Sequence, residues 1–340
     1  MTATPGDAAP TAPATTGLPA MAVARTEPTW TDDMPIFMAP AWLGSQGAEF
    51  GWLEARPTPD LHIAVPFVGR RRVGLRWLQF QWGVWSSRPI DLQTERAFLE
   101  GAVLQCRADG FDFITQPATM ALFRTAPAGA ASAPFGTVLV DLSVTEEELW
   151  GGLTGRNRAI IRKAKSLGVS AEWGSHLADE AHALCAGTMA RSGLSFPGLS
   201  EFRALVEGLG DALDIGVARF DGAPKACVVN PWSRFGAHCL FAGTADSPTQ
   251  GAANLLQWEA MLRAHQHGAG VYDFVGVRLN PEPDSKYAGL LQFKTRFGGE
   301  VIERFLWKMP LNEWKYALYG MMRRMRGDAA DIIDQVGQTR

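Results

Sequence analysis

Residues 268–312 constrain the fold of this chain more than any other stretch. The short apolar run at 271–277 predicts a buried strand, and the prolines, asparagine and acidic residues of 278–285 predict an exposed loop. Apolar side chains at helical spacing over 287–297, followed by two glycines, predict a helix and its end. Residues 300–307 predict a second strand. In this arrangement, the polar loop and the helix lie between two strands that hold them in place. Functional side chains often lie on segments of this kind.

Length and composition allow two domains and argue against some classes of function. A chain of 340 residues can bury two cores. Its formal net charge of −3 argues against nonspecific coating of nucleic acid, but a local basic patch can still hold one RNA stem. The four cysteines lie apart, so we expect reduced thiols in a cytoplasmic protein and no metal site. We expect residues 1–30, rich in Ala, Thr and Pro, to be disordered because they can bury little apolar surface.

Periodicity predicts further helices and strands along the chain. In the first half it predicts a turn at Arg70–Arg72, a helix at 94–107, and strands at 50–55, 61–68, 73–80 and 111–116. In the second half it predicts strands at 215–220, 226–230 and 237–242, and helices at 146–153, 156–167, 178–191, 200–209 and 252–267. Ser143 and Glu146 have the spacing of a capping box for the first of these helices.

Several motifs, in a fixed order, resemble those of the FemABX peptidyltransferases. They are VDLSVTEEELW at 140–150, TMARSG at 188–193, LFAGT at 240–244, YDFVGV at 272–277 and GLLQFKTRFGGEVIE at 289–303. Members of this family use aminoacyl-tRNA to build peptide bonds onto peptidoglycan precursors. The resemblance covers 138–312 well and the N-terminal third loosely. No sustained charged heptads follow the second motif, so the chain resembles the family's short form, without a coiled-coil arm.

The resemblance implies an α/β (α+β) fold made of tandem GNAT-like acyltransferase domains. The first domain would comprise 31–137 plus 310–327, and the second would comprise 138–309 and carry the catalytic motif. Residues 328–340 would form a frayed tail. The implied reaction moves an aminoacyl group from aminoacyl-tRNA to an amine, and it needs no cofactor or metal because an aminoacyl ester is already activated. We expect the protein to act as a monomer.

The resemblance makes Phe293 and Lys294 the candidate catalytic residues, since they stand where the family keeps its Phe-Lys pair. A cation near the ester carbonyl can stabilise the oxyanion of the tetrahedral intermediate. The alternative is an exposed lysine on a capped helix. Under the catalytic hypothesis, Lys294→Met removes turnover and leaves the melting temperature almost unchanged.

Candidate tRNA-binding residues come from the basic run at 156–165, which contains no acidic residue. Arg158, Arg162 and Lys165 share one helical face, which suits phosphates, although a solvated helix face explains the pattern equally well. Arg296 is a fourth candidate.

The acceptor would be a lipid- or nucleotide-linked peptidoglycan precursor or a small secondary metabolite. The candidate substrate-binding residues are Tyr272, Asp273, Trp42, Arg191, Phe196 and Phe241. Gly44 and Phe196 stand where some family members hold a nucleotide diphosphate with cations, and Cys239 and Phe241 replace frequent tyrosines. These departures favour a lipid-linked precursor or a small amine.

Two alternatives remain at this point. One is an acyl-CoA-dependent N-acyltransferase, although the segment SPTQGAA at 247–253 has only one of the glycines expected around a coenzyme A pyrophosphate. The other is a non-enzymatic membrane- or RNA-binding module, because MMRRMR at 321–326 suits an anionic membrane surface. Sensitivity of product formation to RNase, as opposed to dependence on acetyl-CoA, distinguishes the two donors.

Overall fold

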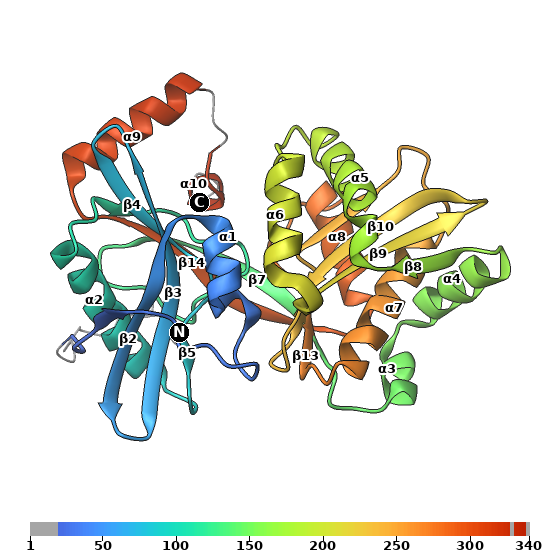
Figure 1. Ribbon diagram of the computed structural model, residues 1–340, viewed down its shortest axis with the longest axis horizontal. Coiled ribbons are helices and arrows are strands. Elements are labelled where there is room, and N and C mark those ends of the chain that lie inside the picture. Colours follow the sequence, from blue (N-terminus) through green and yellow to red (C-terminus); the bar gives the residue numbers. More distant parts are fainter. Residues whose placement is uncertain (1–19, 327–329, 338–340) are drawn as a thin grey trace, which may run out of the picture.

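The chain folds into two lobes that share two long strands (Figure 1). The computed structural model describes residues 20–326 and 330–337. Strands β7 (Ala131–Asp141) and β14 (Glu300–Pro310) run between the lobes as antiparallel neighbours, with Glu300 opposite Leu139 at one end and Lys308 opposite Ala131 at the other. The predicted domain boundary at 137/138 therefore falls inside a strand, because both lobes build their sheets on β7.

The first lobe is a sheet whose strands pair antiparallel except for one parallel pair, and it carries two helices. Its strands are β1 (Ala24–Thr26), β2 (Glu49–Thr58), β3 (Leu61–Arg72), β4 (Leu75–Phe80), β5 (Trp85–Ser86) and β6 (Phe113–Ile114), and its helices are α1 (Pro40–Gln46) and α2 (Leu92–Ala108). The strands predicted at 50–55 and 61–68 are confirmed as β2 and β3, which pair as an antiparallel hairpin. The predicted turn at Arg70–Arg72 is wrong: these arginines end β3, and the chain turns at Val73 and Gly74, which both have positive φ.

The second lobe has two sheets. The other end of β7 continues the long sheet through β13 (Val271–Asp273) to β11 (Ala237–His238), with β11 and β13 parallel. A separate sheet follows the order β12 (Phe241–Thr244), β10 (Ala223–Pro231), β9 (Leu213–Phe220) and β8 (Ser170–Trp173). The helices are α3 (Glu146–Gly152), α4 (Gly155–Ser166), α5 (Ala178–Ala190), α6 (Leu199–Leu209), α7 (Ala252–Gln266) and α8 (Lys286–Thr295).

The predicted capping box is two residues out of register. Thr145 and Glu148 form it, because the Ser143 hydroxyl donates instead to Asp141 Oδ1 at 2.7 Å. The predicted helix at 146–153 is otherwise confirmed.

One hydrophobic core joins the lobes. It contains Phe37 and Trp42 from the first lobe and Phe202 and Val229 from the second, all buried. Two further cores lie under α7 and under α2, one in each lobe.

The predictions for both ends of the chain need correction. Residues 1–19 lie outside the described residues, but 24–26 form β1 and pair with β2, so disorder is wrong there. After α9 (Glu313–Arg326), residues 332–337 form α10, so the prediction of a frayed tail is wrong for this part. The reason is Ile333, whose side chain is buried against Phe135 and Leu306. In the described ranges, no helix is long and apolar enough to span a bilayer.

Candidate active site

Lys294 is held by the backbone that follows β13. The Ser285 hydroxyl accepts from Ala288 N–H at 3.2 Å and so begins α8. Near the end of this helix, Lys294 Nζ donates to the carbonyls of Val275 at 2.6 Å and Gly276 at 2.9 Å. Burial lowers the pKa of Lys294 below its ordinary value, and nearby Cys239 and Asp273 oppose this shift. The alternative of an exposed surface lysine is therefore wrong.

The turn that Lys294 binds has an unfavourable backbone conformation. Val275 has a φ of +55°, which a β-branched residue rarely adopts and which persists only when its surroundings enforce it. Asp273 Oδ1 accepts from Val275 N–H at 2.7 Å and from the Thr137 hydroxyl. Lys294 and Asp273 thus hold this turn from opposite sides, and we no longer expect Lys294→Met to leave stability unchanged.

Gly276 lies in the wall of a groove between the lobes. Two adjoining hollows of about 370 and 630 Å³ share Gln116, Leu194 and Asp331, and we call them together the interlobe groove. The first hollow reaches Gly276, next to the Lys294 ammonium. The second extends to Trp77, on β4. The groove is large enough for an extended small ligand.

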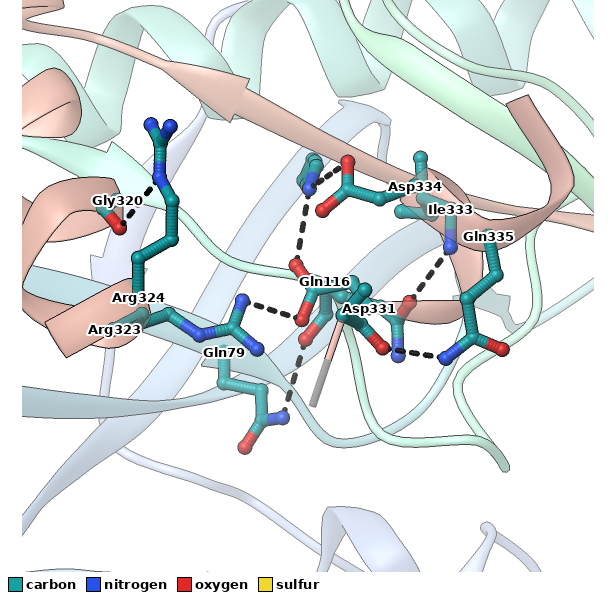
Figure 2. Close-up of polar contacts among 11 residues, drawn as sticks. Gln79, Gln116, Gly320, Arg323, Arg324, Asp331, Ile333, Asp334 and Gln335 are labelled. Atoms are coloured by element: carbon teal, nitrogen blue, oxygen red, sulfur yellow. Dashed lines mark hydrogen bonds and ion pairs between the residues drawn. The ribbon is translucent and has the colours of Figure 1, made fainter. Parts of the chain in front are cut away.

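Residues of the C-terminal segment, including Asp331 and Gln335, line the groove, and Figure 2 shows the polar contacts around them. Ile333 N–H donates to Gln116 Oε1 at 3.1 Å, and Lys308 Nζ donates to Asp331 at 3.0 Å and to Asp334 at 2.6 Å. Asp331 also accepts from Arg323 on α9 at 2.7 Å. Burial acts to lower the pKa of Lys308, but the bonds from Asp334 and Asp331 outweigh it and the pKa is raised. Acidic side chains of the chain itself thus neutralise cations next to the groove.

Three of the predicted tRNA-binding residues lie on α4, and the fourth, Arg296, directly follows α8. Arg158 Nη1 donates to the carbonyls of Gly151, at 2.8 Å, and Leu153, so it closes the end of α3 as well. The remaining contacts are Arg162 over the Trp150 ring at 5.4 Å, Lys165 at 3.9 Å from Glu259, and Arg296 on Gln292 at 2.6 Å. Thr154 N–H and Asn157 Nδ2 both donate to Arg296 O, which joins α4 to α8. A role in tRNA binding remains a prediction.

Tyr272 and Trp42 are wrong as substrate contacts. Tyr272 is fully buried under α7, and its hydroxyl accepts from Asn230 at 3.0 Å and from Gln257. Trp42 is buried in the core that joins the lobes, edge to face with Phe37 at 4.8 Å. The apolar character that made these residues conspicuous in the sequence also buries them. Asp273 is buried as well, and holds the Val275 turn.

The residues from the 191–196 segment and β12 also differ from expectation. Arg191 donates to Asp246 and to Thr244 O, and Phe196 packs on Phe241 with ring centroids 4.9 Å apart. Arg191, Phe196 and Phe241 do not line the interlobe groove. The nearby residues Gly193, Leu194 and Ser195 do line it. Phe293 packs on Phe297 at 5.3 Å and so positions α8; neither Phe293 nor Lys294 itself lines the groove.

Sequence reasoning missed Gln116, Arg278 and Lys308. Gln116 and Lys308 lie inside or beside predicted strands, where nothing in the local pattern indicates which face meets the groove. Arg278 follows the strand at 271–277 directly, and this position at the end of a strand is a signal that could have pointed to it. In the part of the chain that the structure describes, no cluster of metal-binding side chains is present.

Two comparisons with known proteins match the C-terminal part of the chain to the FemAB family or to one relative. A family model described as the FemAB family matches residues 227–324. A curated relative, the lipid II:glycine glycyltransferase of Staphylococcus haemolyticus (strain JCSC1435), is 33% identical over 93 residues, which are 24% of this chain and 21% of the relative's length.

Solved structures show the fold. The crystal structure of FemX has a TM-score of 0.57 and 13% identity, with 82% of this chain and 93% of that chain covered. The C-terminal domain of a protein assigned as a lysylphosphatidylglycerol synthetase from Agrobacterium fabrum has a TM-score of 0.50 and 15% identity, with 81% and 89% covered. The expected α/β fold of tandem GNAT-like domains is confirmed.

Proposed function

From the match of residues 227–324 to the FemAB family model, we propose that this chain is a FemABX-type transferase, which moves an aminoacyl group from aminoacyl-tRNA to an amine of a lipid-linked peptidoglycan precursor. The family model and the glycyltransferase relative support a transferase of this class. The observation that carries the proposal is the Lys294 ammonium, fixed next to the Gly276 wall of the interlobe groove.

The bonds of Lys294 leave one N–H for the reaction. Its ammonium has three donors, and the Val275 and Gly276 carbonyls take two. In the proposed step, the acceptor amine nitrogen attacks the ester carbonyl carbon, and the third N–H stabilises the resulting oxyanion. The bond from this carbon to the terminal ribose oxygen then breaks. The amine proton passes to that oxygen, and the tRNA leaves with a free hydroxyl.

The surroundings of Lys294 suit this role. Removing the ammonium from water lowers its pKa, and the same low-dielectric environment strengthens its attraction to a developing negative charge. Because its backbone partners fix its position before substrate arrives, little reorganisation is needed during the reaction.

The basic face of α4 gives the tRNA a path toward Lys294. Arg162 and Lys165 are exposed there, and the start of α4 meets the end of α8 at Arg296 O. Phosphates on this face would lie within one helix length of the reacting ester.

The α7 N-terminus disfavours the acyl-CoA alternative. Gly251 precedes α7 with a φ of +85°, and a Cβ there would lie 2.9 Å from the Ala164 Cβ and 3.0 Å from Ile160 O. The glycine therefore allows α7 to pack on α4, instead of exposing backbone N–H groups to a pyrophosphate.

Helix α9 favours an acceptor at a membrane surface. It exposes Trp314, Met321 and Met325, with Arg324 and Arg326 exposed beside them. Aromatic and sulfur-containing side chains flanked by arginines suit an anionic bilayer interface. This exposed side of α9 would bring the groove close to lipid-linked precursors.

A transfer assay with the full chain tests the proposal. The protein is incubated with total charged tRNA and lipid II, and mass spectrometry measures added aminoacyl residues. We expect product that disappears when RNase is added first. Product that survives RNase and requires acetyl-CoA would overturn the proposed donor. Product on a nucleotide-linked precursor but not on lipid II would overturn the proposed acceptor.

A further inference from the structure

A second cavity lies on the sheet face between the lobes, apart from the interlobe groove. It measures about 300 Å³, and Trp82, Leu122, Leu139 and Phe235 give it apolar walls. It shares no lining residue with the two hollows of the interlobe groove. Its volume is at the lower end of the range for small-molecule sites. We call it the sheet cavity.

One end of the sheet cavity carries an imidazole without a hydrogen-bond partner. His238 is fully buried and lines the cavity, with Trp82 and Phe37 packed on its ring. Among the described residues, neither ring nitrogen has a hydrogen-bond partner. Its Nδ1 lies 3.6 Å from Asp273 Oδ2, too far for a hydrogen bond. Buried polar groups of native proteins are nearly always satisfied, so this ring is suited to a ligand.

The other end carries a guanidinium without a carboxylate partner. In the ranges that the structure describes, the side chain of Arg304 makes one hydrogen bond, to Glu303 O at 2.7 Å, and no ion pair. The nearby Glu95 is already used, because its two oxygens accept from Arg124 N–H and Arg124 Nε. Burial lowers the pKa of Arg304, and the Arg124 guanidinium adds to this effect. An anion bound at Arg304 would offset both the cost of burying its charge and the repulsion from Arg124.

The strand register separates these two groups. Arg304 lies opposite Phe135 on β7, whereas His238 lies opposite Asp273, whose own partner on β7 is Leu139. Phe135 and Leu139 are four residues apart on β7, which is roughly 13 Å along the strand. From β14 across β7 and β13 to β11 there are three strand spacings, or roughly 14 Å. Arg304 and His238 therefore reach into the cavity from opposite ends.

We propose that the sheet cavity binds a small monocarboxylate with an apolar or aromatic body, whose carboxylate pairs with Arg304 and whose far end hydrogen-bonds His238. A planar guanidinium binds a carboxylate through two parallel N–H bonds. The apolar walls then cover the body of the ligand. This proposal concerns a second site and does not depend on the proposed aminoacyl transfer.

Binding of 3-(4-hydroxyphenyl)propanoate to the full chain tests the proposal by calorimetry and by ligand-observed NMR. We expect saturable binding that its methyl ester weakens at least tenfold, because the ester has no charge for Arg304. Arg304→Met should weaken binding of the acid at least tenfold. Arg71→Met, at an exposed arginine away from the cavity, should leave it unchanged. His238→Phe should abolish the preference for this probe over 3-phenylpropanoate.

Three outcomes would overturn the proposal. They are no binding of either acid at millimolar concentration, equal binding of acid and ester, and wild-type binding by Arg304→Met. The first would mean that the cavity holds water only. If His238→Phe fails to fold, the comparison of acid with ester and the Arg304→Met variant still decide, since Met keeps most of the apolar stem of arginine.

Discussion

Lys294→Met removes both proposed roles of the Lys294 ammonium, which are to support the Val275 turn and to stabilise the oxyanion. Met nearly preserves side-chain length but removes the ammonium, so the carbonyls of Val275 and Gly276 lose their donor. A buried acceptor left without a partner costs about 1–3 kcal/mol, or roughly 2–6 kcal/mol for two. Part of this is offset because a buried charge no longer has to be desolvated. We expect a net loss of about 2 kcal/mol, which lowers the melting temperature by roughly 4–8 °C.

The effect on turnover should be much larger than the effect on folding. Loss of one electrostatic contact to a developing oxyanion lowers the rate by about 100- to 1000-fold. Single-turnover transfer from charged tRNA, measured 15 °C or more below the variant's own melting temperature, separates the two effects. Lys286→Met is the matched control, since Lys286 is exposed on the same helix. It should change neither quantity.

Two results would refute this reasoning. If folded Lys294→Met transfers the aminoacyl group within a few-fold of the wild-type rate, Lys294 is only a support for the Val275 turn. If the melting temperature does not move, the two backbone hydrogen bonds contribute nothing to the fold. Ethylammonium added to Lys294→Ala gives an independent check, because a chemical role predicts recovery of turnover without recovery of melting temperature.

Three further predictions follow from charge. The lowered pKa of Lys294 means that rapid-mixing turnover should fall as pH rises through a value below the ordinary 10.5, and Lys294→Arg should move this decline to higher pH. Because the pKa of Lys308 is raised, the free energy of unfolding should keep the contribution of its pairs with Asp331 and Asp334 up to pH 10.5 and lose it at higher pH. Asp334→Asn should lower the free energy of unfolding by about 1 kcal/mol at neutral pH. Full-length protein should sediment with phosphatidylglycerol vesicles but not phosphatidylcholine vesicles, and Arg324→Glu should release it.

Much of the fold could be predicted because local patterns determine it. The helix at 252–266 and the strands around the turn at Asp221–Gly222 follow from apolar spacing and from two residues that accept positive φ. The capping box failed by two residues because Ser143 and Thr145 both precede glutamates at suitable spacing. Only the bond from Ser143 to Asp141 decides between them.

The sites could not be predicted in the same way, because they depend on contacts between distant segments. Lys294 was identified by motif, but the motif gave no sign that its ammonium binds backbone 18 and 19 residues away. Arg304 and His238 reach one cavity only because β14, β7, β13 and β11 lie side by side. Tyr272 was misassigned because strand alternation places it on the face opposite Asp273, beneath α7.

The turn at Val275 connects the two cavities physically. Asp273 lines the sheet cavity and uses one carboxylate oxygen to hold Val275 N–H, while its other oxygen lies 3.6 Å from His238. On the far side, Lys294 holds the carbonyl of Val275 and that of Gly276, which lines the interlobe groove. A ligand that moves His238 closer to Asp273 would bring its ring to Oδ2 and so shift the carboxylate whose Oδ1 holds Val275 N–H. Occupancy of the sheet cavity should therefore change the position of the Lys294 ammonium, and binding in the two cavities should be coupled reciprocally.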